Sequence, residues 1–145
     1  MLFKQGRECL KIEVLGYEFP TGGAPGSDDA NWLSLRGTYT APDGTMTCGA
    51  NSCLLASETA ELAAGLKVLA AGVTEDFLSR LQEPYFELAA ESDGETGFLV
   101  SVTFVIPLKN DDVFPAELEV PFTKRKLLEL AGELEETAEK YPPRV

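Results

Sequence analysis

The amino-acid sequence predicts an α+β protein: an antiparallel sheet of about six strands in two three-stranded blocks, in βββα-βββα order, with a C-terminal helix packed on one face. Segments with apolar residues at every second position predict the strands, and segments with leucines at helical spacing follow each group of three. Short turns join the strands within each block, which favours antiparallel pairing. Runs of strands followed by helices indicate an α+β protein rather than a doubly wound sheet.

The first block of strands begins near Leu10. We expect its strands over residues 10–19, 31–41 and 45–55. The first of these changes its apolar parity at Gly16, which indicates a β-bulge. Glycine and aspartate residues predict a loop over 20–30, and Asp43-Gly44 predicts a tight hairpin turn.

A helix is expected between the two blocks, over residues 58–71. Ser57 is its expected N-cap, and Gly72 is expected to end it. Thr74 is expected to cap one further helical turn over 75–81.

The second block is expected to hold strands over residues 83–91, 98–108 and 114–122. The middle strand carries Leu99 and Val105 outside its main apolar parity, so we expect it to be central and partly covered on both sides. Thr123 is the expected N-cap of a last helix that runs from Lys124 to about Tyr141.

The charge of the chain is strongly acidic. It has 145 residues, with 24 Asp and Glu against 12 Lys and Arg and a net charge of −12. This length predicts a single domain over 1–145. A field of that sign repels nucleic-acid phosphates and anionic lipids and attracts cationic proteins. Either the charge serves only solubility, or it serves a basic protein partner, with nucleic acid and membranes disfavoured.

The expected location is the cytoplasm. No apolar run is long enough to span a bilayer, and the first residues lack the pattern of a signal peptide. The three cysteines are an odd number, which then indicates reduced thiols in a cytoplasmic protein.

The chain has no histidine, so catalysis by serine-histidine or cysteine-histidine groups is excluded. Three cysteines alone do not make an ordinary zinc site. We therefore expect no catalytic residues, no metal site and no cofactor. An enzyme that works through carboxylates alone, or through carboxylates and Mg²⁺, remains an alternative.

The candidate binding residues are mainly acidic and belong to the second block. If its strands form a meander, parity places Glu87 and Glu91 on one flank and Glu117 and Glu119 on the other, with Tyr85 on the same outward face. Such a face suits a basic protein partner. The alternative is a solvated face whose charges prevent edge-to-edge pairing of sheets.

Trp32 lies on the polar side of its predicted strand. It is therefore either covered by a loop or a contact residue for a partner. Asp28 and Asp29 precede it and would extend an acidic contact region.

Three basic residues, Lys124–Lys126, fill the first turn of the last helix and oppose its dipole. They mark an anion site, or they pair with nearby carboxylates and lay their stems on apolar surface.

Six stretches carry a family resemblance: Leu15–Pro20, Asp29–Leu33, Pro42–Gly44, Cys53–Leu55, Glu83–Leu88 and Tyr141–Arg144. In this order and spacing they resemble the WapI-type immunity proteins, small bacterial proteins found beside polymorphic toxins. The resemblance covers almost the whole chain, and it rests on order and spacing because no single motif is specific. It implies a cytoplasmic antidote that binds the nuclease domain of a toxin and has no catalytic residues of its own.

The expected function is therefore that of a small acidic binding protein, an immunity protein that neutralises a nuclease-type toxin by direct binding. Two alternatives stay open: a small enzyme that depends on carboxylates or Mg²⁺, and a regulatory or structural protein without a toxin partner.

Overall fold

The computed structural model of the chain describes residues 1–20 and 28–144. The strands in these ranges are β1 (Leu2–Gln5), β2 (Glu8–Tyr17), β3 (Trp32–Thr40), β4 (Met46–Leu55), β5 (Asp76–Leu78), β6 (Phe86–Ser92), β7 (Gly97–Pro107) and β8 (Val113–Thr123). The helices are η1 (Asp28–Ala30), α1 (Ala56–Ala70), η2 (Lys109–Asp111) and α2 (Lys124–Lys140), of which η1 and η2 are single 3-10 turns.

The strands form two antiparallel sheets, each with four strands in chain order: β1-β2-β3-β4 and β5-β6-β7-β8. The predicted α+β class is therefore confirmed. The predicted count of six strands is wrong, because the described residues form eight, and the two blocks build separate sheets rather than one.

β1 and β5 are the strands that the sequence does not predict. β1 has four residues of which only Phe3 is buried, too few for an alternation to show. β5 lies where the sequence predicts a helical turn capped by Thr74. It pairs with the end of β6, and its Phe77 packs against Gly65 of α1, where a Cβ would overlap the Phe77 ring. These tertiary contacts outweigh the local helical signal.

The β-bulge predicted at Gly16 is confirmed. The pairing of β2 with β3 shifts register between Val14 and Gly16. Gly16 has a φ of 135°, a region that favours glycine.

Helix α1 begins at Ala56, so the prediction that Ser57 caps it is wrong. Leu55 takes the N-cap position, and its N–H donates to Oε1 of Glu58 at 2.8 Å. A carboxylate in the first turn thus satisfies a backbone donor that a hydroxyl cap would leave free. Gly72 follows the helix with a φ of 78°, as predicted for its end.

Helix α2 begins where the sequence predicts. Oγ1 of Thr123 accepts a hydrogen bond from the N–H of Lys126 at 3.1 Å, which confirms Thr123 as the N-cap. The buried stripe of the helix comprises Leu127, Leu130, Ala131 and Leu134.

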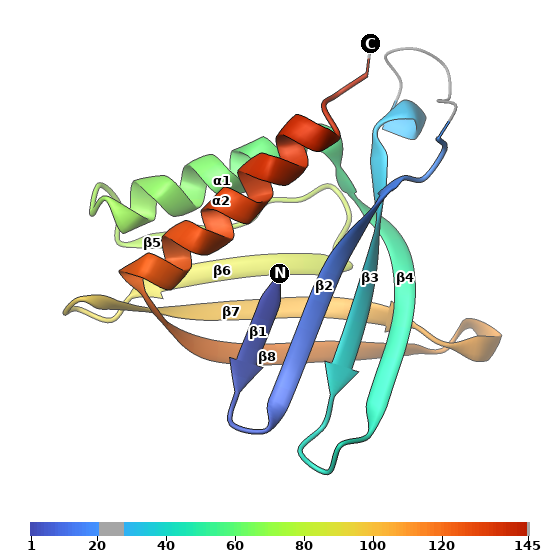
Figure 1. Ribbon diagram of the computed structural model, residues 1–145, viewed down its shortest axis with the longest axis horizontal. Helices are drawn as coiled ribbons and strands as arrows, with labels where there is room; N and C mark the ends of the chain where they lie inside the picture. Colours follow the sequence, from blue (N-terminus) through green and yellow to red (C-terminus); the bar gives the residue numbers. More distant parts are fainter. Residues whose placement is uncertain (21–27, 145) are drawn as a thin grey trace.

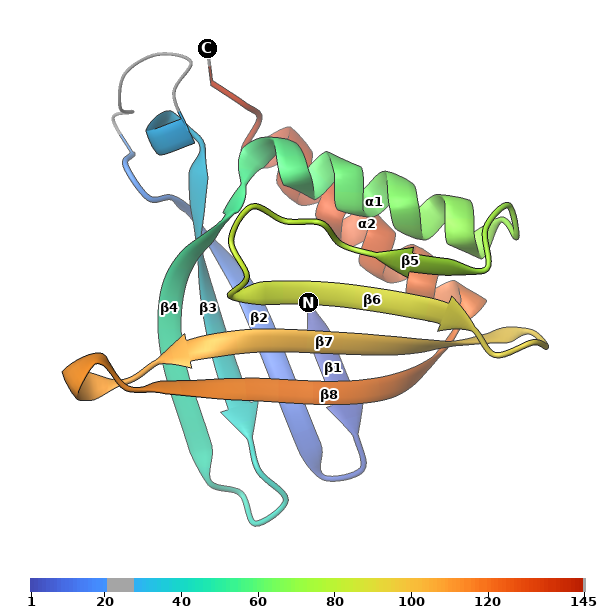
Figure 2. The ribbon, with the colours of Figure 1, turned by 180° about the vertical axis from the view of Figure 1, so that it is seen from behind.

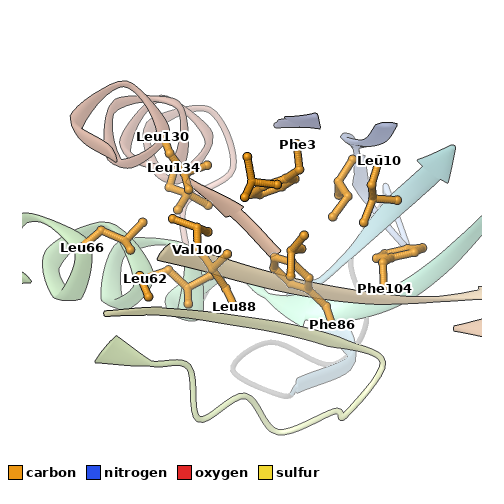
Figure 3. Packing of buried hydrophobic residues seen from close by; sticks show 14 of the residues in the cluster. Phe3, Leu10, Leu62, Leu66, Phe86, Leu88, Val100, Phe104, Leu130 and Leu134 are labelled. Atoms are coloured by element: carbon orange, nitrogen blue, oxygen red, sulfur yellow. The ribbon is translucent and has the colours of Figure 1, made fainter. Parts of the chain in front are cut away.

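The two sheets cross steeply, and both helices lie on the same side of β5–β8 as the first sheet (Figure 1). Side chains from both sheets and both helices form one hydrophobic cluster. Figure 3 shows Phe3 and Phe104 in the part of this cluster between the sheets, and Leu62 and Leu134 in the part formed by the helices. Gly37 permits the close contact of the sheets, because a Cβ there would overlap the Phe104 ring. No helix or strand of residues 1–20 and 28–144 covers the opposite side of β5–β8 (Figure 2).

Candidate functional site

The uncovered side of the second sheet carries four of the predicted contact residues. Glu87 and Glu91 on β6 and Glu117 and Glu119 on β8 are all exposed, and the residues that alternate with them point into the core. No other strand or helix lies in front of β6, β7 and β8 in Figure 2. These four glutamates, together with Ser101 and Thr103 of β7, are called the acidic face below.

Strand register aligns the acidic face in rows. Glu87, Thr103 and Glu117 are Cα partners across the three strands, and Ser101 is the partner of Glu119 in the next row. Because neighbouring strands are about 4.8 Å apart, the two columns of carboxylates stand roughly 10 Å apart. A hydroxyl-lined strip lies between them, wide enough for a basic side chain to reach both columns.

The charge of the acidic face is not compensated by the described part of the chain. The ion pairs among the described residues join the Met1 amino group to Glu133, Lys11 to Glu13, Lys67 to Glu135 and Arg125 to Glu129. None of these involves the acidic face. The four carboxylates therefore meet water and any partner with their charges unpaired by residues 1–20 and 28–144.

Tyr85 stands beside the acidic face, directly before β6, and 40% of it is exposed. Its carbonyl accepts a hydrogen bond from the N–H of Val105 at 2.8 Å. The loop that leads to it is anchored on buried groups: Oε2 of Glu58 accepts from the N–H of Gln82 at 2.9 Å, and Oγ of Ser79 accepts from the N–H of Leu88 at 2.9 Å. A fixed aromatic residue of this kind makes a contact at low entropic cost.

The outer edge of the sheet is poorly suited to strand addition. Val105 directs its N–H toward β6, so its pair with Pro115 on β8 is not hydrogen-bonded. The N–H that Pro115 lacks would therefore point away from the sheet, and Pro121 has the same parity. Prolines at such positions protect an edge strand. Recognition at this side of the molecule consequently rests on side chains.

The described residues offer little for catalysis. They contain no group of three or more His, Cys, Asp or Glu that could hold a metal ion. The three cysteines are free, and Cys53 is buried. Burial, with smaller contributions from Glu58 and Glu83, raises the pKa of the Cys53 thiol to about 12, which makes it unreactive at neutral pH. In the same ranges, no helix is both long and apolar enough to cross a membrane.

The chain matches the model of a protein family described as the immunity protein WapI-like family, over residues 1–142. The chain belongs to the WapI-like immunity protein family. The match spans both sheets and both helices and confirms the predicted family resemblance. A search of curated proteins found no match. Membership of the WapI-like family supports an immunity function, implies a toxin partner and indicates a binding role rather than an enzymatic one.

The remaining predicted contact residues of this WapI-like protein lie at the start of β3 and in η1 just before it. Trp32 begins β3 and is half-buried, and the exposed Asp29 belongs to η1 just before it. Asp28 begins η1, and the glycine-rich stretch 21–27 lies outside the described residues. The structure thus groups Tyr85 with the four glutamates and leaves Asp28, Asp29 and Trp32 elsewhere (Figures 1 and 2).

The region around η1 is tied to the C-terminal residues. Nε of Arg144 donates to the carbonyl of Ala30 at 2.7 Å, and Nη2 donates to the carbonyl of Phe19 at 2.9 Å. The guanidinium lies over the Tyr17 ring, 3.7 Å from its centroid, and the Tyr17 hydroxyl donates to the carbonyl of Pro142 at 2.5 Å. Arg144 therefore connects the end of β2 to η1 through backbone carbonyls.

In the basic cluster Lys124–Lys126, two side chains contact nearby groups of the protein, which is the second of the two interpretations given for this cluster. Nε of Arg125 pairs with Oε1 of Glu129 at 3.2 Å, and Nζ of Lys126 lies 5.9 Å from the centroid of the Phe122 ring. Arg125 is therefore paired with a carboxylate and Lys126 lies near an aromatic ring, as the second interpretation expects.

Sequence reasoning missed a hollow of about 400 Å³ that borders the acidic face, between β5, β6 and β7. Asp76 and Leu78 on β5 and Ala89 on β6 contribute to its lining. No local signal marks the β5 residues, because a three-residue strand is shorter than the window in which alternation becomes visible.

Proposed function

We propose that this WapI-like immunity protein neutralises a nuclease-type toxin in the cytoplasm by direct binding, with the acidic face covering the basic nucleic-acid site of the toxin. It acts without a cofactor and without catalysis. The observation that supports this most is the uncovered sheet face with four exposed carboxylates in two columns, none of them paired with a described residue.

Charge complementarity explains why such a face would recognise a nuclease. A surface that binds phosphates carries Lys and Arg, and these are the groups that two columns of carboxylates attract. The same attraction steers the encounter and raises the association rate constant toward about 10⁸–10⁹ M⁻¹s⁻¹ at low salt. A protein with a net charge of −12 would also be repelled by the nucleic-acid substrate, so the two would compete for one toxin surface without binding each other.

Tyr85 adds an apolar anchor to this charged surface. Charges at an interface control rate and specificity, whereas aromatic residues commonly dominate the binding energy. The exposed ring of Tyr85, held by its loop at the end of the Glu87 column, would supply that part of the energy.

A double charge reversal tests the proposal. The probe is the C-terminal domain of the toxin encoded beside this gene, and the association rate is measured at 20 mM and at 200 mM NaCl. Glu87→Lys with Glu117→Lys should slow association at least about tenfold at low salt, and the difference should shrink at high salt because added ions screen the face.

The matched control is Glu61→Lys with Glu136→Lys, which changes the net charge equally at exposed positions on α1 and α2. It should have a much smaller effect. No complex between the wild-type chain and the toxin domain at micromolar concentration would refute the proposed function. Equal effects of the two double variants would remove the acidic face from it.

A further inference from the structure

The hollow beside the acidic face has a regular construction. Two rows of outward residues cross β5, β6 and β7: Leu78, Ala89 and Ser101 in one, and Asp76, Glu91 and Leu99 in the other. The small Ala89 stands between larger neighbours and leaves a space of about 400 Å³. Its floor combines the apolar Ala89 and Leu99 with the hydroxyl of Ser101, and Asp76 and Glu91 supply two carboxylates.

These two carboxylates are placed unfavourably for the isolated protein. Asp76 and Glu91 are direct Cα partners on antiparallel strands, and both are exposed. Like charges directly opposite each other destabilise a sheet. Arg80 lines the same hollow, yet no ion pair joins it to either carboxylate among the described residues. A cation placed between these two cross-strand carboxylates would therefore be attracted by both.

We propose that this hollow receives an arginine side chain of the basic toxin partner. The guanidinium would pair with Asp76 and Glu91, and its flat face would lie on the apolar part of the floor beside Leu99. Arginine suits the site better than lysine because its planar, weakly hydrated group binds two carboxylates at once and packs on apolar surface. The exposed Leu78, 58% accessible, would cover the stem of the side chain.

This assignment rests on the proposed function for the identity of the partner, but the chemistry of the hollow can be tested without the toxin. The probe is N-acetyl-arginine amide, titrated at low salt into ¹⁵N-labelled protein, with N-acetyl-lysine amide in parallel. We expect amide shifts to cluster at Asp76, Ala89, Glu91 and Leu99, and to be larger for the arginine compound.

The cluster of shifts should disappear in Asp76→Asn and persist in Glu136→Gln, which removes the same charge from an exposed position on α2. Shifts that are spread over the acidic surface, or equal for the two compounds, would overturn the assignment. This result would leave the proposed function standing, because that function is judged by binding of the toxin domain.

A second measurement separates a binding role from a structural one. Asp76→Asn should raise the urea midpoint of the free protein at low salt, since it removes the like-charge pair, while it weakens binding of the toxin domain at least about tenfold. Ala89→Arg should also raise the urea midpoint and weaken toxin binding, because it puts a guanidinium into the hollow from the chain itself. Ala89→Gln is the uncharged control for this variant. Unchanged toxin affinity in Asp76→Asn and Ala89→Arg, with the wild-type chain binding normally, would refute the proposal.

Discussion

At the scale of the residue, several side chains satisfy backbone groups rather than one another. The carboxylate of Glu58 is buried and accepts from two backbone N–H groups, those of Leu55 and Gln82. Within the described ranges, the guanidinium of Arg144 donates to backbone carbonyls, those of Phe19, Pro20 and Ala30. Both residues hold loops in place, so charged groups inside this protein position the chain, and the charges on the acidic face remain available to a partner.

Cys53 gives a pH dependence that can be measured. An unfolded thiol has a pKa of about 8.5, whereas burial raises the pKa of Cys53 to about 12 in the folded protein. Between these values the folded state keeps a proton that the unfolded state has lost, so the free energy of unfolding falls as pH rises. The stabilisation is complete below about pH 8.5 and is lost on approaching pH 12.

Urea unfolding at pH 7.5, 9.5 and 10.5 checks this expectation. Cys53→Ala should lower stability at pH 7.5 through lost packing, but its stability should decline less steeply with pH than that of the wild type. Cys48→Ala, at an exposed position, should keep the wild-type slope. Tyr39, whose pKa is raised by its hydrogen bond to Glu8, titrates in all three proteins and cancels in the comparison. Parallel slopes for the wild type and Cys53→Ala would contradict the buried-thiol assignment.

At the scale of the element, the contact of α1 with β5 depends on a glycine inside a helix. Gly65 lies against the ring of Phe77, and a Cβ there would overlap this ring. Around Gly132 in α2, a Cβ would meet no described atom within 4 Å other than the neighbouring backbone of its own helix. The two helices therefore offer a matched pair of positions with opposite expected responses to the same substitution.

Gly132→Ala should stabilise the protein by up to about 1 kcal/mol, because alanine is the better helix former. Gly65→Ala gains the same propensity but forces Phe77 and β5 to move, and it should destabilise by about 1–3 kcal/mol. Thermal and urea unfolding of the two variants measure both effects. A stabilising Gly65→Ala would show that β5 is not held against α1 as described.

The elements that the sequence predicts correctly are those whose signal is local. β6 and β8 alternate between buried and exposed residues, so the outward positions of Glu87 on β6 and of Glu117 and Glu119 on β8 follow from the sequence. The N-cap at Thr123 and the β-bulge at Gly16 are predicted from the conformational preferences of threonine and glycine. β5 and the start of α1 are mispredicted because they depend on partners far away in the chain, Gly65 for Phe77 and the N–H of Gln82 for Glu58.

The candidate site also has a part that local sequence patterns predict and a part that depends on distant pairing. Parity and composition predict the acidic face, but the hollow needs the pairing of β5 with β6, and no local pattern contains that pairing. The separation of Trp32 and Asp29 from the acidic face depends on the two blocks forming two sheets, which period-two alternation does not distinguish from one.

At the scale of the whole molecule, one hydrophobic cluster joins both sheets and both helices. We therefore propose that residues 1–145 unfold as a single domain. The protein has a net charge of −12, and residues 1–20 and 28–144 form four ion pairs. Repulsion among the carboxylates is expected to oppose the compact state.

Salt should therefore stabilise this protein. Raising NaCl from 10 to 200 mM shortens the screening length from about 30 Å to less than about 10 Å and weakens the repulsion. We expect the urea midpoint to rise, with fluorescence and circular dichroism reporting the same transition. Glu61→Gln with Glu136→Gln should raise the midpoint at 10 mM and reduce its dependence on salt. A midpoint that falls with NaCl, or two separate transitions, would contradict this description of the molecule.

The alternation of β6, β7 and β8 has a consequence for how such a protein can diverge. Every second residue along most of these strands is buried, and the residues between them are exposed or half-buried on the opposite side of the sheet. Substitutions on the outward positions can accumulate without repacking the interior. Under the proposed function, a gene of this kind could therefore change the specificity of the protein for its partner in small steps, each one leaving the fold intact.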